Sequence, residues 1–180
     1  MLEKNNIKMI EEIKNVIISS RQKVAYEVNT AMINAYWNVG RIIVENEQNG
    51  NIKAEYGKQI IRELSKELRN VLGTGFSVSN LFNMRKFYIT YPKFQTVSGK
   101  LSWSHYCELL SIENEDERNF YEKECINSNW SVRELKRQLE TSLFERLLLS
   151  DGKNNKEKVY KLSKEGQILS KPDDILKEPY

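Results

Sequence analysis

The sequence of 180 residues is short of histidine, cysteine and proline, and each shortage narrows what the chain can be. The one histidine, His105, leaves no histidine–cysteine cluster with metal-ligand spacing, and a lone histidine at a helix start is typically structural. Cys107 and Cys125 are the two cysteines, and without an export signal they favour a reducing cytoplasm. The three prolines leave long stretches free to form helices.

Long apolar runs are missing as well. No run approaches the roughly 18 residues that a membrane helix needs. The first 15 residues contain acidic side chains and no continuous apolar stretch, so we expect no signal peptide. A hydrophobic content of 39% can still fill a core, and 29% charged residues with a mean hydropathy of −0.62 indicate a soluble protein.

Acidic residues are absent from one forty-residue window, Leu68 to Cys107. Its five positive charges exceed the net charge of +3, so the rest of the chain is net negative. A basic, aromatic segment of this kind is typical of a protein that binds a polyanion. A core-rich segment that happens to lack acids is an equal alternative. The basic residues are Arg69, Arg85, Lys86, Lys93 and Lys100. The aromatic residues, with the histidine, are Phe76, Phe82, Phe87, Tyr88, Tyr91, Phe94, Trp103, His105 and Tyr106.

Apolar spacing of three and four residues predicts an all-α, multi-helix bundle. A first helix is expected over 7–47, with a break near Ser19–Ser20 as one option, followed by helices over 52–72 and 77–91. Ser77, Asn114 and Ser131 are predicted to cap later helices, and Ser102 a short one. The predicted buried stripe of the first helix is Val24, Val28, Ala31, Ala35, Val39 and Ile42. That of the second is Tyr56, Ile60, Leu64, Leu68 and Val71, and that of the third Val78, Leu81, Phe82, Tyr88 and Ile89.

The second and third predicted helices meet across a glycine turn at residues 73–76, which is the form of a helix-turn-helix. Arg85 falls in the apolar stripe of the third helix, so we expect it to be partly buried and paired. An ordinary αα-hairpin is the structural alternative. The free face of the third helix carries small polar and basic side chains suited to bases and phosphates. That face consists of Ser79, Asn80, Asn83, Lys86 and Thr90.

Catalysis has little support in the sequence. Glu-x-Lys triplets of the kind found in metal-dependent nucleases occur at Glu12 and Glu134, but both lie on predicted helices without a carboxylate-bearing strand beside them. We therefore expect no active site and no cofactor in this chain. After Asp151-Gly152 the composition becomes rich in lysine and punctuated by glycine and asparagine, which predicts a domain over 1–150 and a linker over 151–180.

Several strings together resemble the N-terminal domain of the YhcG family, over about residues 35–145. The most specific are Leu-Ser-Trp-Ser-His at 101–105 and Trp-Ser-Val-Arg-Glu-Leu at 130–135, accompanied by Gly-Phe-Ser at 75–77 and Met-Arg-Lys-Phe-Tyr at 84–88. In that family the domain precedes a nuclease domain of the PD-(D/E)XK type. The resemblance therefore implies a role in DNA binding or assembly, and a nuclease motif that would lie beyond Tyr180.

The hypothesis from the sequence is a cytoplasmic, non-catalytic module that binds DNA and positions a downstream nuclease domain. The alternative is a protein–protein interaction module whose first helices form a homodimer. Phosphate contacts are expected near the third helix and at a second basic patch. The first group adds Lys93 and Lys100 to the face of the third helix, and the second patch is Arg133, Lys136 and Arg137.

Overall fold

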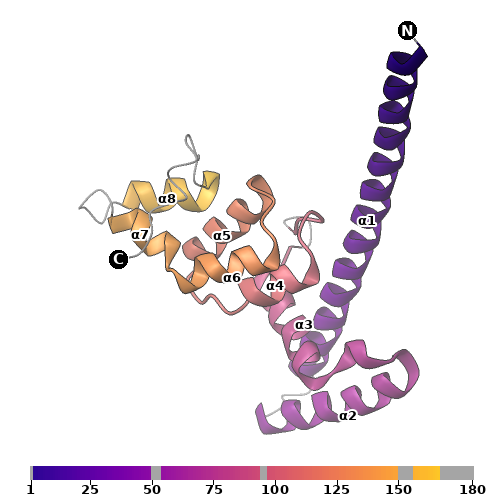
Figure 1. Cartoon of the computed structure of the whole chain (residues 1–180). Coiled ribbons are helices and arrows are strands. Elements are labelled where there is room, and N and C mark those ends of the chain that lie inside the picture. Colours follow the sequence, from indigo (N-terminus) through magenta and orange to yellow (C-terminus); the bar gives the residue numbers. More distant parts are fainter. Residues whose placement is uncertain (1, 50–53, 94–96, 150–155, 167–180) are drawn as a thin grey trace. The chain divides into compact units, whose positions relative to one another are not determined.

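The computed structural model describes residues 2–49, 54–93, 97–149 and 156–166, and every regular element within these ranges is helical (Figure 1). The all-α fold expected from the sequence is confirmed. The chain divides into two compact units, residues 1–103 and 104–180. The first contains α1 (Leu2–Asn49), α2 (Ala54–Leu72), a 3₁₀ turn (Thr74–Phe76) and α3 (Val78–Thr90). The second contains α5 (Glu115–Asn127), α6 (Val132–Glu140), α7 (Leu143–Leu149) and α8 (Lys156–Glu165), and α4 (Trp103–Leu109) starts at the boundary.

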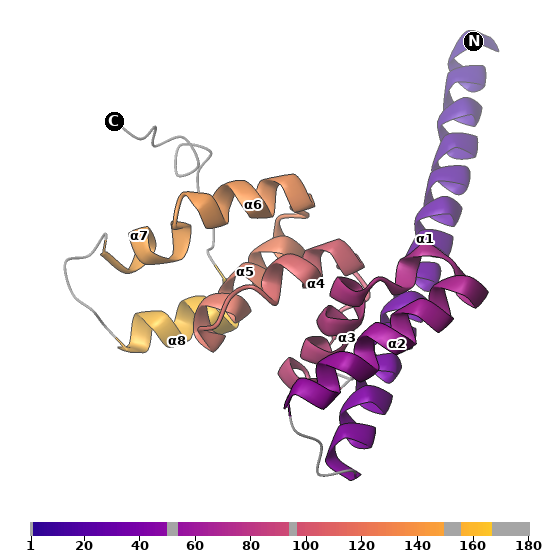
Figure 2. The same cartoon turned by 90° about the horizontal axis from the view of Figure 1, so that it is seen from below.

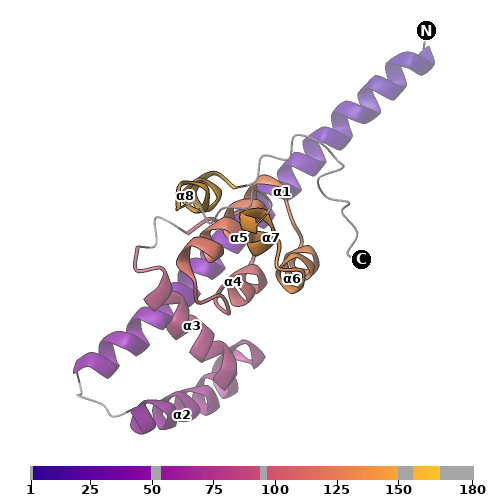
Figure 3. The ribbon, with the colours of Figure 1, turned by 90° about the vertical axis from the view of Figure 1, so that its left-hand side faces the viewer.

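Helix α1 is one continuous helix, without the break that the serine pair at 19–20 allowed (Figure 3). The Ser19 hydroxyl donates to the carbonyl of Val16 at 3.0 Å, so it is satisfied within the helix and does not interrupt it. Only the second half of α1 packs within this unit, whereas every residue from 6 to 28 is exposed. The first half of α1 extends beyond α2 and α3 in Figure 1.

The buried face of α1 differs from the predicted stripe. Val24 and Val28 are exposed, as are Ala31, Ala35 and Ile42, and Val39 alone is partly covered. Aromatic side chains set the orientation, because the ring of Tyr36 packs on Trp103 at 4.8 Å and that of Trp37 on Tyr88 at 5.0 Å between centroids. The side chains that α1 buries are Ile33, Ile43 and Val44.

Helix α3 crosses the second half of α1, and α2 lies beside both (Figure 2). Ile43 of α1, Ile61 of α2, and Leu81 and Met84 of α3 form the shared core. At the crossing the α1 backbone approaches α3 so closely that a Cβ on Gly40 would collide with the carbonyl of Met84. Glycine is therefore required there for the two helices to pack.

The predicted apolar faces of α2 and α3 need correction at their ends. Met84 and Phe87 are fully buried, whereas Ile89 is 52% exposed, because the crossing with α1 covers the side of α3 that carries Phe87. On α2, Val71 is 79% exposed because the helix ends past the core. The side chain of Tyr56, also expected in the core of α2, lies outside the described residues.

The second unit is built around α5, against which α7 and α8 pack. The predicted caps are confirmed: Asn114 accepts from the Glu117 amide at 3.0 Å and Ser131 from the Glu134 amide at 3.2 Å. Helix α8 lies inside the segment expected to be a linker, and the Asn127 side chain donates to the carbonyl of Glu165 at 3.2 Å. Helical structure thus continues past residue 150, and residues 167–180 lie outside the described part.

Candidate nucleic-acid interface

The turn between α2 and α3 is braced from both sides. The Ser65 hydroxyl, buried on α2, donates to the carbonyl of Phe76 at 2.9 Å. Ser77 caps α3 as predicted, since its hydroxyl accepts from the Asn80 amide at 3.2 Å. Gly73 adopts a φ of 90°, which glycine accepts without strain. These contacts fix where α3 starts relative to α2.

Four of the predicted face residues of α3 reach solvent. Ser79 and Lys86 are exposed, and Asn83 and Thr90 are half-buried. Ser79 shares a hydrogen bond of 3.2 Å with the hydroxyl of Ser77. No carboxylate of the described residues forms an ion pair with Lys86. The ammonium group of Lys86 is therefore the accessible positive charge of this face.

Asn80 is occupied inside the unit. Its side-chain oxygen accepts from the Trp103 indole at 2.8 Å, and its side-chain nitrogen donates to the carbonyl of Gly75. The amide therefore ties the start of α3 to the glycine turn and to Trp103. Sequence alone placed Asn80 beside the free face, and the one hint of this bracing role was its position three residues after a capping serine.

Arg85 is paired and partly buried, as the sequence predicts. Its Nε atom lies 3.0 Å and 2.8 Å from the two carboxylate oxygens of Glu47, near the end of α1. The ion pair joins α3 to α1 and neutralises the guanidinium. Arg85 and Lys86 are adjacent in the sequence, but only Lys86 is left to attract an external anion.

Lys93 and Lys100 are both exposed and belong to the same unit as α3. The segment around Lys100 is held on α1 by Asn29, whose amide nitrogen lies 2.8 Å from the carbonyl of Gly99 and 2.6 Å from that of Leu101. Residues 94–96 between the two lysines lie outside the described part. The two hydrogen bonds from Asn29 hold the backbone on either side of Lys100 against α1.

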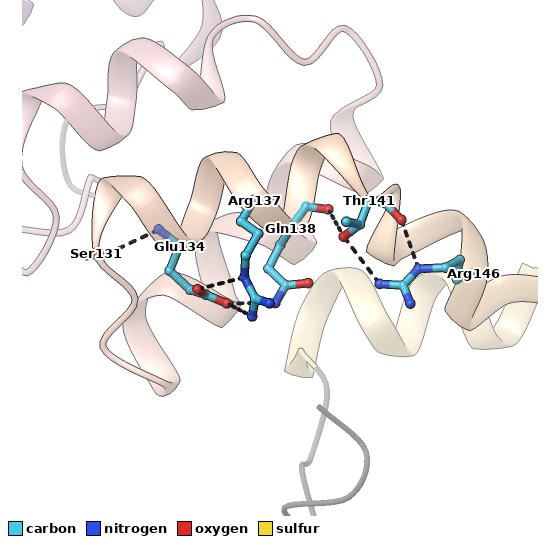
Figure 4. Close-up of polar contacts among 6 residues, drawn as sticks. All are labelled: Ser131, Glu134, Arg137, Gln138, Thr141 and Arg146. Carbon is cyan, nitrogen blue, oxygen red and sulfur yellow. Dashed lines mark hydrogen bonds and ion pairs between the residues drawn. The ribbon is translucent and has the colours of Figure 1, made fainter. Parts of the chain in front are cut away.

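Two of the three cations of the second predicted patch, on α6, pair with carboxylates, and Figure 4 shows the pair of Arg137 with Glu134. Arg137 contacts both oxygens of Glu134, at 3.1 Å and 2.7 Å, and this hydrogen bonding lowers the pKa of the Glu134 carboxyl. Lys136 pairs with Glu108 at 3.2 Å. Arg133 is exposed and is the remaining cation of the patch.

Sequence reasoning missed a row of basic side chains on α2. Arg62, Lys66 and Arg69 are exposed and line an open hollow of about 460 Å³ beside the glycine turn. Their spacing of four and three residues was visible in the sequence and places them on one helical face. The acid-free window starts at Leu68, so it contains Arg69 but leaves out Arg62 and Lys66, and the row could not be seen from the window alone.

The residues considered for catalysis have structural contacts. The Nε2 atom of His105 lies 2.9 Å from the carbonyl oxygen of Trp130, and Glu134 is engaged by Arg137 and Gln138. Within the described ranges, no group of three or more His, Cys, Asp or Glu side chains is placed to hold a metal ion. Among those same residues, no helix is both long and apolar enough to cross a membrane.

The described elements are all helices, and the pair formed by α2 and α3 is braced across its turn, which defines an all-α helical domain. Residues 12–146 match the model of the DUF1016 N-terminal domain, and the chain belongs to this family. It is 38% identical to a protein named putative nuclease YhcG from Escherichia coli strain K12, over 78% of this chain and 46% of that protein. The resemblance seen in the sequence is confirmed, and the chain spans about half the length of this relative. No solved structure matches it.

Proposed function

We propose that this chain is a non-catalytic DNA-binding module of a larger, cytoplasmic nuclease. The name of the relative supports the nuclease context, and the 46% coverage leaves room in that protein for a separate catalytic domain. By the family resemblance, that domain would be of the PD-(D/E)XK type and would follow residue 180. The observation that carries DNA binding is the exposed face of α3, with Lys86 free of ion pairs among the described residues.

In this proposal α2, the glycine turn and α3 act as a helix-turn-helix. The start of α3 enters the major groove, where Ser79 and Asn83 meet base edges. Lys86 meets a phosphate, and Lys93 and Lys100 add contacts to the flanking backbone. Asn80 holds α3 in position from within, so its role is to orient the helix. The patch on α6 contributes through Arg133, because its other two cations are neutralised within the unit.

Fluorescence anisotropy with labelled duplex DNA at increasing salt tests this proposal. Each phosphate contact contributes about 0.9 to the negative slope of log affinity against log salt, so Lys86→Ala should flatten the slope by about that amount. Lys161→Ala is the matched control, since Lys161 is an exposed lysine on α8 outside the proposed face. Asn83→Ala should reduce discrimination between sequences. If the parent chain does not bind duplex DNA even at low salt, the proposal is wrong.

The absence of hydrolysis is tested separately. Purified chain with supercoiled plasmid and Mg²⁺ or Mn²⁺ should leave the plasmid intact, because the described carboxylates and histidine are not assembled around a metal position. Plasmid cleavage that co-purifies with the chain, and that Glu134→Ala abolishes, would contradict a purely accessory role.

Homodimerisation is a second candidate function, and the exposed half of α1 favours it. Ile10, Ile13, Ile17 and Val24 are 48–63% exposed and recur at spacings of three, four and seven residues, which is the heptad pattern of a coiled coil. Because α1 does not fold back on itself, a second copy of the chain is the partner we propose. The two functions are compatible, since a dimer would present two DNA-binding faces.

Sedimentation equilibrium tests the dimer. Ile10→Glu with Ile17→Glu should convert a dimer to a monomer without unfolding the chain, because both side chains are already exposed. Val71→Glu with Leu72→Glu is the control, since it places the same two charges on exposed positions of α2. A parent chain that sediments as a monomer at high concentration rules out this partner.

A further inference from the structure

The hollow on α2 lies outside every site discussed from the sequence. It is lined by residues of α2 together with Gly73, Thr74 and Val78, which follow α2 in the sequence. The hollow has a volume of about 460 Å³ and is open to solvent. The site therefore suits part of an extended molecule that runs past it.

The charge of the hollow has one sign. Arg62, Lys66 and Arg69 follow one another along α2, and within the described part of the chain none of them forms an ion pair. The two acids interspersed with them, Glu63 and Glu67, lie off this face, since a helix turns by about 100° per residue. Glu63 is also engaged by the Gln59 amide at 3.1 Å. The hollow thus presents three cations to an incoming anion.

The turn that closes the hollow leaves room for close approach. A Cβ built on Gly73 or on Gly75 would meet no atom within 4 Å, so no side chain covers the backbone there. Thr74 between them is exposed. The hydrogen bond from Ser65 to Phe76 holds this turn on α2, so the cations and the turn keep a fixed spacing.

We propose that this hollow binds the phosphate backbone of DNA and anchors the duplex against α2 while α3 reads it. Arginine suits this role, since a guanidinium binds phosphate oxygens in a bidentate manner. The span from Arg62 to Arg69 is seven residues, about 10 Å of helix. Successive phosphates of one strand advance by about 3.4 Å along the duplex axis, so the three cations match a short run of phosphates. The inference rests on the proposed function and extends it to a surface that α3 does not contain.

The salt dependence of duplex binding tests the hollow. Arg62→Gln with Arg69→Gln should flatten the slope of log affinity against log salt by about 1.8, equally for unrelated sequences, because two phosphate contacts are lost. Lys123→Gln with Lys161→Gln removes the same charge from exposed positions on α5 and α8 and should leave the slope near that of the parent.

A second pair of variants separates charge from shape. Thr74→Asp places a negative charge at the edge of the hollow and should weaken binding roughly fivefold relative to Thr74→Asn, which has nearly the same size without the charge. If the parent chain binds DNA while the double arginine substitution leaves the salt slope unchanged and the two Thr74 variants bind equally well, the inference about the hollow is wrong and the proposed function stands. A parent chain that does not bind DNA overturns both.

Discussion

Replacing Gly40 by alanine should test whether the first unit depends on the close crossing of α1 and α3. The added Cβ would collide with the carbonyl oxygen of Met84, lie 2.7 Å from its carbonyl carbon and 3.1 Å from the Cβ of Tyr88. The nearest atoms belong to the α3 backbone, which cannot rotate away as a side-chain tip can. The helices must separate at the place where Met84 and Phe87 are fully buried.

Two opposing effects set the magnitude. Alanine is favoured over glycine in a helix interior by about 1 kcal/mol. Overpacking a tight contact costs about 1–3 kcal/mol, and the upper end applies because backbone must move. The expected net loss is about 2 kcal/mol, which lowers the melting temperature by roughly 4–8 °C in a chain of this size. Thermal unfolding followed by far-UV circular dichroism measures it.

Gly57→Ala is the matched control on α2. Its Cβ would lie 3.3 Å from a carboxylate oxygen of Glu47, which is the end of a flexible side chain and can shift by a few tenths of an ångström. This variant should melt at or slightly above the parent temperature, because the gain in helix propensity remains. If Gly40→Ala is as stable as Gly57→Ala, the crossing does not constrain the fold and the reasoning fails.

Two further predictions concern the second unit. Tyr121→Phe should lower the free energy of unfolding by about 1–2 kcal/mol in urea titrations, because the Tyr121 hydroxyl accepts from the buried amide of Phe144 at 3.3 Å and that amide would lose its partner; an unchanged urea midpoint would show that the bond contributes nothing. Burial raises the pKa of Tyr121 from 10.0 and that of Cys125 from 9.0, each to about 12. Well below pH 9.0 the Tyr121 hydroxyl and the Cys125 thiol are protonated in both the folded and the unfolded chain. Between pH 9.0 for the thiol, or 10.0 for the hydroxyl, and about 12, only the unfolded chain releases these protons, so the free energy of unfolding should fall as the pH rises. In urea midpoints measured across this alkaline range, the fall should be smaller for Cys125→Ala, and an equal fall would exclude the thiol as a cause.

The starts of α3, α5 and α6 could be predicted from the sequence because their signals are local. Ser77, Asn114 and Ser131 each cap a helix as their spacing indicates. The pairing of Arg85 was also foreseeable, since a charge within an apolar stripe must find a partner. The partner itself, Glu47, was not, because it lies on another helix far away in the sequence.

The buried faces were harder because they depend on contacts between helices. A stripe of alanine and valine predicts one face of α1, whereas the larger rings of Tyr36 and Trp37 determine the observed one through Trp103 and Tyr88. The indole of Trp37 also donates to the carbonyl of Tyr91 at 2.7 Å, which no periodicity could indicate. Periodicity identifies a helix, and side-chain size decides which face packs.

The acid-free window shows why a charge count along the chain is an incomplete guide to a binding surface. Its aromatic content belongs mainly to the core, since Phe87, Tyr91 and Tyr106 are buried. One of its five cations, Arg85, forms an ion pair with Glu47 within the unit. Arg62 and Lys66 lie before the window begins, separated from Arg69 in the sequence by an acid but aligned with it on α2. Charge that could attract a phosphate backbone is therefore better counted by helical face than by consecutive residues, and by that measure the accessible positive surface starts on α2.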